Sequence, residues 1–354
     1  MSVDTPTAAP AGRRLSDTMR EAASKYGLIA VLLAWPLYLA ITDLADTGTL
    51  TDLGNNLVLG LSNGAIFALI ALGYTLVYGI IELINFAHGE VFMIGSFVAF
   101  GLWGNFGLTE STGAGGLVAG LLVAMLVAML VCGVLNVMIE RVAYKPLRNA
   151  PKLAPLITAI GFSFILQNVG VLWLGSSPIS VPDLIDQSNV VTDIGGVRIH
   201  NGDILAVAVT APLVFLLTSF ISRSRLGKAM RATAQDPDAA RLMGINVNTT
   251  ISVTFLLGGM LAGAAGLMNL LYQTSVWYFQ GFTAGLIAFT AAVMGGIGNL
   301  KGAVLGGLII GCIQQISDNR LGAQWTTAVV FGYLVLIMVF RPQGLIGEQT
   351  REAG

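Results

Sequence analysis

The chain has 354 residues, of which 55% are hydrophobic and only 10% are charged, and its formal net charge is −1. Soluble domains carry about 25% charged residues, so this composition excludes a water-soluble protein and indicates an integral membrane protein. At about 20 residues a span, the length allows roughly ten membrane-spanning helices with short connections.

The apolar segments between charged residues predict the spans in chain order. Residues 1–25 are poor in large apolar side chains and are predicted to form a cytoplasmic tail. The first apolar segment starts too far in for a usual secretory signal and lacks a convincing cleavage site, so it is predicted to be a retained anchor. The membrane domain is predicted over 26–341, followed by a cytoplasmic tail over 342–354. The predicted spans are 26–41, 56–81, 91–106, 116–139, 155–174, 204–221, 251–272, 282–297, 303–316 and 326–340.

The predicted fold class is an all-α polytopic membrane protein with about ten, and at least eight, transmembrane helices. The short segments are 91–106, 282–297 and 303–316. If two of them are partial or re-entrant helices buried in protein, an arrangement of eight spans is the alternative. The peptide NFAHGEVF (85–92) resembles NLKGAVL (299–305), which is compatible with an internal repeat and equally with chance in a glycine-rich chain.

Lysine and arginine predict the orientation of these spans. When the N-terminus is placed inside and ten spans alternate, all but two of the 18 Lys and Arg residues fall on the inner side. Only Arg198 and Arg320 fall outside, whereas the acidic residues divide almost evenly. Both termini are therefore predicted to be cytoplasmic.

The largest predicted outer connection is the polar loop 175–202. Valine and isoleucine residues at 190–191 and 197–199 flank Gly195 and Gly196, which predicts a small hairpin. A plain connector and a docking surface for an external protein are both compatible with this loop.

The inner segment 223–248 is the longest polar, helix-prone run between apolar segments. Asp236 is predicted as an N-cap, with Pro237 in the first helical position and Gly244 in the left-handed conformation after the helix. A helix only ~10 Å long is not stable alone, so it is predicted to be held by the spans and packed into a groove. The alternative is an amphipathic loop on lipid headgroups. Its apolar face is predicted to contain Ala239, Leu242 and Met243.

Motifs for energy conversion are missing from the sequence. It contains no GxxxxGK[ST] loop, nucleophile elbow, HExxH or pair of catalytic carboxylates, and the spacing of its two histidines and two cysteines supports no metal site. Glu82, Glu90 and Glu140 fall at predicted span ends and are interpreted as solvated boundary charges, so no ionisable group is expected deep in the membrane. Energy for active transport would then come from another subunit.

Uncharged polar residues inside the apolar runs are the remaining signal. Facing lipid would be costly for them, so they are predicted to face protein or a water-filled path. Two roles are compatible with this prediction: contacts between helices, and the lining of a transport path. A path lined by amides and hydroxyls would suit a neutral or zwitterionic substrate. These residues are Asn63, Gln167, Asn168 and Asn269, and the accompanying apolar lining is predicted to be Phe67, Phe162 and Phe289.

Several longer motifs resemble a known family. They are SNGAIFALIALGYTLVYGIIELINFAHGEVFMIGSF (62–97), ERVAYKPLR (140–148), ITAIGFSFILQN (157–168), RATAQDPDAARLMGIN (231–246) and AFTAAVMGGIGNLKGAVLGGLIIG (288–311). Together they resemble the permease subunit of bacterial branched-chain amino acid ABC importers, in the same order along the chain. A urea-importing branch shares the NFAHG core, so a urea or short-amide permease is an alternative. A self-contained secondary transporter or channel, and a membrane scaffold without transport, are alternatives from other classes.

The resemblance implies a transport subunit of the bacterial inner membrane with no enzymatic activity and no cofactor of its own. Its implied partners are a second homologous permease, two cytoplasmic ATPases that carry ATP and Mg²⁺, and an external substrate-binding protein, with no nucleic acid. The implied ATPase-coupling residues are Arg231, Gln235, Asp236, Ala239, Leu242, Met243 and Gly244. The candidate path or gating residues are Asn63, Asn85, His88, Glu90, Gln167 and Asn168.

Overall fold

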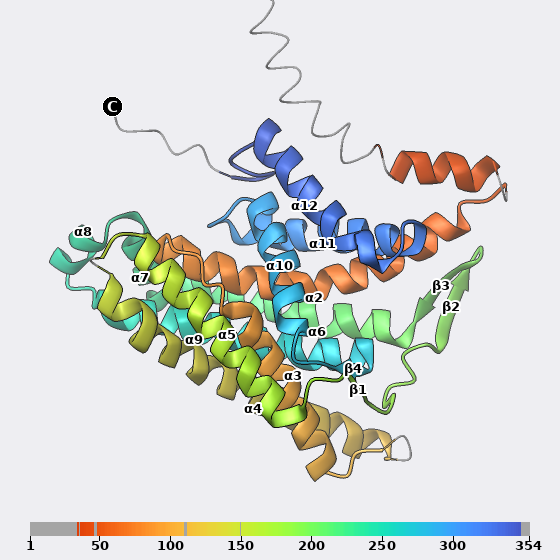
Figure 1. The fold of residues 1–354 in the computed structure, drawn as a ribbon, viewed down its shortest axis with the longest axis horizontal. Helices are drawn as coiled ribbons and strands as arrows, with labels where there is room; N and C mark the ends of the chain where they lie inside the picture. Colours follow the sequence, from red (N-terminus) through yellow and green to blue (C-terminus); the bar gives the residue numbers. More distant parts are fainter. Residues whose placement is uncertain (1–33, 35, 46–47, 110–111, 149, 348–354) are drawn as a thin grey trace, which may run out of the picture.

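The computed structural model describes residues 34, 36–45, 48–109, 112–148 and 150–347, and most of these are helical (Figure 1). Its helices are a short one at Pro36–Ala45, α2 (Thr51–Ile81), α3 (His88–Asn105), α4 (Ala114–Ile139), η1 (Glu140–Tyr144), η2 (Lys145–Leu147), α5 (Leu153–Leu174), α6 (Asn201–Arg223), α7 (Arg225–Gln235), α8 (Pro237–Leu242), α9 (Val247–Gln273), α10 (Gln280–Gly295), α11 (Leu300–Arg320) and α12 (Ala323–Phe340). The strands are β1 (Ile179–Ser180), β2 (Val190–Ile194), β3 (Val197–His200) and β4 (Ser275–Val276).

The predicted spans agree closely with these helices. Seven of the described helices are long and apolar enough to cross a membrane, and α3 and α10 are the predicted spans in the described region that fall outside this set. Helix α11 extends several residues beyond the predicted 303–316 at its carboxyl end, so it is not a short segment. Most of the predicted first span, 26–41, lies outside the described residues. The chain is therefore a mostly helical, polytopic membrane protein.

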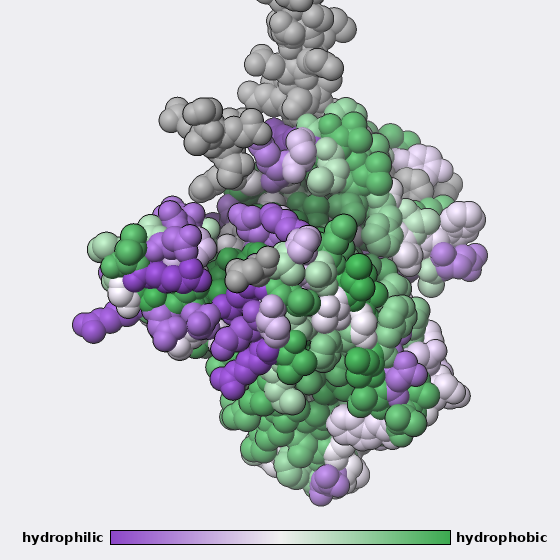
Figure 2. Space-filling model, turned by 60° about the vertical axis from the view of Figure 1, so that its left-hand side comes forward, coloured by the Kyte–Doolittle hydropathy of each residue, from purple (hydrophilic) through white to green (hydrophobic). Residues whose placement is uncertain are grey.

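Helices α2, α6, α9 and α11 run between two ends of the molecule, whereas α4 and α5 run obliquely to a third side (Figure 1). At one end, called the hairpin end, the Arg198 backbone N–H donates to Asn55 at 2.8 Å, and Arg320 pairs with Asp43 at 2.6 Å. The opposite end, called the α8 end, carries α7 and α8 together with the turns before α3, α5 and α11 (Figure 1). Figure 2 shows hydrophilic residues gathered at the α8 end and hydrophobic residues over the helices beside it.

The predicted hairpin in the loop 175–202 is confirmed. Strands β2 and β3 pair antiparallel around Gly195 and Gly196, whose positive φ angles of 64° and 91° allow the tight turn. A second pairing was not predicted: Ile179 of β1 lies opposite Val276 of β4 and ties this loop to the connection between α9 and α10. The loop therefore covers the hairpin end of the helices.

Helix α2 is at the centre of the bundle and packs against α11, α9, α10 and α6. Two GxxxG sequences bring α2 and α11 together, because a Cβ atom built on Gly311 would lie only 2.3 Å from the Gly64 Cα. Glycine at both positions lets the two backbones meet, as it does in membrane helix pairs. The interlocking glycines are Gly60 and Gly64 of α2 with Gly307 and Gly311 of α11.

Candidate functional site

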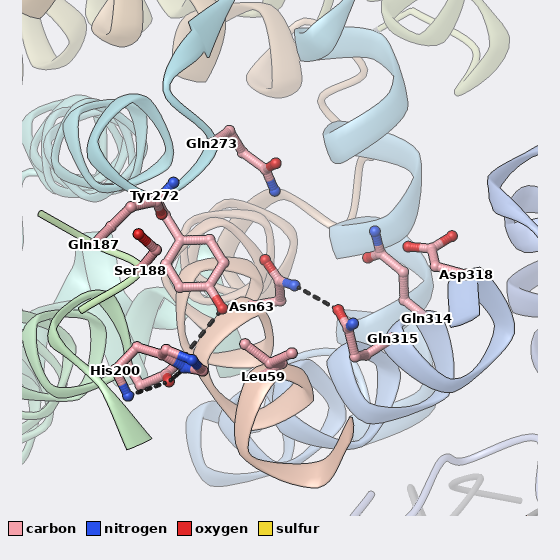
Figure 3. Close-up of a pocket in the computed structure, with 11 residues that line it drawn as sticks. Leu59, Asn63, Gln187, Ser188, His200, Tyr272, Gln273, Gln314, Gln315 and Asp318 are labelled. Atoms are coloured by element: carbon pink, nitrogen blue, oxygen red, sulfur yellow. Dashed lines mark hydrogen bonds and ion pairs between the residues drawn. The ribbon is translucent and has the colours of Figure 1, made fainter. Parts of the chain in front are cut away.

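A cavity of about 460 Å³ opens at the hairpin end between α2, α11 and the carboxyl end of α9 (Figure 3). The cavity is rich in amides, because turns of α2 and α11 face one another there and each presents amide side chains. Asn63 donates to the Gln315 side-chain oxygen at 3.2 Å across the cavity. The other polar residues of its lining include Gln187, Ser188, His200, Asp203, Tyr272, Gln273, Gln314 and Asp318.

The carboxylate of Asp203 in this lining is already engaged. One of its oxygens accepts from the Tyr272 hydroxyl at 3.2 Å, and the other accepts from the His200 backbone N–H at 2.9 Å. Asp203 is also nearly fully buried. The amides of the cavity are therefore the groups best placed to meet a ligand.

Two further hollows adjoin this cavity and together with it form what we call the groove. A hollow of about 340 Å³ near the hairpin end shares Leu59, Gln315 and Asp318 with the cavity. A hollow of about 290 Å³ on the other side shares Gln273 and Gln314 with it. Along α2 the lining advances from residues 52–59 through 59–63 to Phe67, so the three hollows follow one helix inward. The innermost one adds apolar side chains and further polar ones, which are Phe67, Phe92, Ala284 and Ile287 together with Asn269, Gln280 and Thr283.

The predicted path residues divide between the groove and the packed interior. Asn63, Asn269 and Phe67 line the groove, as a path would require. Asn85 instead lies buried between helices, where it donates to Asn136 at 3.1 Å and accepts from the Tyr144 hydroxyl at 3.3 Å. Phe289 borders a separate small cavity, and Phe162 packs against the core.

Asn168 lies on an exposed face of α5 and donates to the Phe164 carbonyl of its own helix at 2.8 Å. The prediction that it faces protein or a path is therefore not met within the described part of this chain.

Glu90 and Glu140 are not boundary charges, contrary to the interpretation of the sequence. Both are fully buried, whereas Glu82 is exposed as expected. Glu90 accepts from Ser163 at 3.2 Å and from Gln167 at 2.9 Å, both on α5.

The burial of Glu90 has a simple geometric cause. Helix α3 begins inside the bundle, where His88 approaches Gly73, roughly two turns before the end of α2, and packs edge-on against the ring of Tyr74. The expectation that no ionisable group lies deep among the spans is therefore wrong. A pattern of charge along the chain locates the end of α2 but cannot show that the next segment turns back into the protein.

At the α8 end, the predicted capped helix is confirmed. Asp236 accepts from the backbone N–H groups of Asp238 and Ala239, both at 2.9 Å, and Gly244 has a φ of 81°. Leu242 and Met243 are 89% and 83% exposed. The expected groove for this face is therefore not supplied by the described part of this chain, and the apolar face is open.

Helix α8 is attached to the bundle through its other side and through α7. Ala240, on that other side, is buried. The Arg231 guanidinium donates to the backbone carbonyls of Ile221 and Ser222 at the end of α6, which fastens α7 to that helix. Gln235 is exposed at the end of α7. Arg231 therefore positions the segment, while the apolar face of α8 stays exposed.

Comparison with known proteins identifies the chain. The family model described as "Branched-chain amino acid transport system / permease component" matches residues 56–339. The chain belongs to this family. The chain is 44% identical over 298 residues to the high-affinity branched-chain amino acid transport system permease protein BraD of Pseudomonas aeruginosa, covering 84% of this chain and 96% of that protein.

The permease protein LivH of Escherichia coli K12, from a system of the same description, is 40% identical over 295 residues, covering 83% of this chain and 95% of that protein. A solved structure described as PsaBC from Streptococcus pneumoniae in complex with Fab has a TM-score of 0.42 and 14% identity, covering 84% of this chain and 94% of that chain. The relatives are transport permease subunits, and the permease described here is likewise not an enzyme.

Replacing Asp236 by Ala will loosen α8 of this permease. The variant leaves two N–H groups at the helix start without their side-chain acceptor, which costs about 1 kcal/mol. Amide hydrogen exchange over residues 237–243 of the purified permease will then be roughly fivefold faster. Asp238→Ala is the control, because among the described residues the Asp238 side chain pairs with exposed Arg241 and accepts from no helix N–H, so exchange should change little. Equal protection in wild type and Asp236→Ala would contradict the capping role.

Proposed function

We propose that this permease is the membrane subunit of an ATP-driven importer of branched-chain amino acids and that the groove is its share of the translocation path. The observation that carries the proposal is a groove along α2 that offers amides over its whole length and adds the apolar side chains of Phe67, Phe92 and Ile287 further in. Family membership and the named activity of the relatives support the same conclusion.

The lining suits an amino acid with an aliphatic side chain. Asn and Gln side chains offer both donors and acceptors, so one set of amides can meet the ammonium and the carboxylate of a zwitterion. Among the described residues that line the groove, none is Lys or Arg, which disfavours an anionic ligand. The carboxylates of Asp203 and Asp318 in the lining already accept from the Tyr272 and Thr326 hydroxyls. Phe67, Phe92 and Ile287 of the inner hollow would then receive the aliphatic side chain.

Energy enters through α8 in this proposal. The sequence contains no nucleotide-binding motif, and Leu242 and Met243 present an open apolar face on a capped helix. An ATPase that covers this face and moves it would drive the permease. The complete transporter would contain a second homologous permease, two ATPases that carry ATP and Mg²⁺, and an external substrate-binding protein over the hairpin end.

The proposed topology has ten crossings with both termini in the cytoplasm. Arg148, Lys152 and the exposed basic residues of α7 lie at the α8 end, whereas Arg198 and Arg320 lie at the hairpin end. An excess of Lys and Arg faces the cytoplasm in membrane proteins, so the α8 end is assigned to the cytoplasm. The possible internal repeat would relate the turn before α3 to the turn before α11.

The substrate assignment is tested by competition in the assembled transporter. Uptake of labelled leucine should be suppressed by unlabelled isoleucine and valine and not by urea. Suppression by urea alone would move the assignment to the urea or short-amide branch.

A self-contained secondary transporter is the second candidate function, and the buried carboxyl of Glu90 favours it, because ionisable groups inside membrane domains often serve ion coupling. Leucine transport by the purified chain alone in liposomes would support that candidate and contradict an ATP-driven importer.

Replacing Ala284 by Phe will obstruct the inner part of the groove. The added ring enters a hollow of about 290 Å³ beside Phe67 and Ile287, so leucine uptake by the assembled transporter should fall about tenfold or more, equivalent to ~1.4 kcal/mol. Ala208→Phe, on an exposed position of α6, is the matched control and should transport normally. Equal uptake by the two variants would remove the inner hollow from the path.

A further inference from the structure

The ERVAYKPLR segment, Glu140–Arg148, has a polar arrangement around one buried carboxylate that the path and α8 do not explain. Glu140 follows α4 in a π-helical turn, and its carboxylate is fully buried. One oxygen pairs with Arg148, and the other accepts from the Ser252 hydroxyl at 2.8 Å. The Arg148 guanidinium also donates to Asn248 at 2.6 Å. We call these four residues the Glu140 network.

A buried ion pair such as that of Glu140 and Arg148 is weak evidence for a purely stabilising role. A buried ion pair must offset the loss of hydration of both charges, and well-packed apolar side chains of similar size are often equally stable in its place. A hydrogen-bonded pair does restrict the relative position of the segments that it joins. Single π-helical turns are also frequent at functional sites, and this one places Glu140 against α9.

The network joins the first turns of α9, which follow α8, to the α4–α5 connection. Only Ile245 and Asn246 separate Gly244, after α8, from the start of α9, and Asn246 caps α9 by accepting from the Thr249 N–H at 3.1 Å. Asn248 and Ser252 of the network lie within the first two turns of that helix. A displacement of α8 therefore reaches the network through a short, capped segment.

On its other side the network leads toward the groove. Arg148 lies shortly before the start of α5, and α5 packs mainly against α3 and the π-helical turn. Ser163 and Gln167 then bond α5 to Glu90 at the start of α3. Phe92, in the same turn as Glu90, lines the inner part of the groove.

We propose that the Glu140 network transmits the movement of α8 to α4 and α5 and thereby to the inner part of the groove. Its residues are positioning residues, since they touch neither the substrate path nor the exposed face of α8. The inference rests on the proposed function, in which a partner ATPase moves α8.

The test uses the complete transporter reconstituted in liposomes and compares leucine uptake with ATP hydrolysis. The double variant Asn248→Ala/Ser252→Ala removes the two side-chain hydrogen bonds from α9 to Arg148 and Glu140 and leaves the ion pair of Glu140 and Arg148 in place. Uptake per ATP hydrolysed should fall about tenfold, a usual size for coupling between sites. Thr249→Ala, exposed on the same turn of α9, should retain the wild-type ratio. The single variant Ser252→Thr keeps the hydroxyl and should also retain it.

The possible outcomes separate this inference from the proposed function. An unchanged ratio in the double variant overturns transmission through the network. A parallel loss of assembly, hydrolysis and uptake assigns the network to folding and also overturns it. Normal uptake by a Leu242→Asp transporter overturns the coupling through α8, and with it the network's role. A reduced ratio in the double variant, with normal assembly and normal controls, supports the proposal.

Discussion

Replacing Leu242 by Asp will abolish leucine uptake while the permease still folds and inserts. The side chain is 89% exposed at the end of α8, so a charge there disturbs little within the chain. In a complex with an ATPase, however, the same position would be covered by protein, and an unpaired carboxylate buried at an interface is strongly unfavourable. Loss of a central interface residue costs about 2–4 kcal/mol, which corresponds to binding weaker by roughly 30-fold or more.

The measurement is co-purification of the ATPase with the permease, together with uptake and ATP hydrolysis in liposomes. Leu242→Met is the matched control, because it preserves the volume and the apolar surface of the side chain and should behave nearly as wild type. Both variants should accumulate in the membrane equally. Unchanged ATPase binding and uptake in Leu242→Asp would show that the open face of α8 is not the coupling surface.

Replacing Gly311 by Ala will destabilise the centre of the bundle. The new methyl group would lie 2.3 Å from the Gly64 Cα and backbone nitrogen, and a backbone contact of this kind cannot be relieved by a rotamer change. Helices α2 and α11 must separate, and overpacking of this type typically costs about 1–3 kcal/mol. The groove lies between the same two helices, since Asn63 and Gln315 line it, so uptake should fall as well.

The matched control for this variant is Gly332→Ala in α12. A Cβ atom at Gly332 would meet nothing within 4 Å, and Ala is a better helix former than Gly by about 1 kcal/mol. The thermal unfolding midpoint in detergent should therefore drop for Gly311→Ala and stay level or rise for Gly332→Ala. Equal midpoints would contradict the close packing of α2 against α11.

Features determined by neighbouring residues could be predicted from the sequence. The spans follow from runs of apolar residues between charges, and the cap of α8 follows from Asp236, Pro237 and Gly244. The hairpin follows from Gly195 and Gly196 between valine-rich segments. Each of these depends on hydrogen bonds or backbone angles within a few residues, so the local sequence is sufficient to specify it.

Other features were decided only by the tertiary structure. Glu90 and Glu140 look like boundary charges in the sequence, and their burial depends on α3 beginning inside the bundle and on partners as distant as Ser163 and Ser252. The sequence does not predict Gln187, Gln273, Gln314 and Gln315 as path residues, because amides are common in a polar loop, where Gln187 lies, and near span ends, where the other three lie. Segments far apart in the sequence bring them together.

The sequence by itself thus determined the class of the protein, the positions of its helices and the capped helix α8, because hydrophobicity, capping and turn geometry act locally. The tertiary structure decided which polar groups share a groove and which charges are buried, because these depend on close contacts between α2, α9 and α11 that only the folded chain creates.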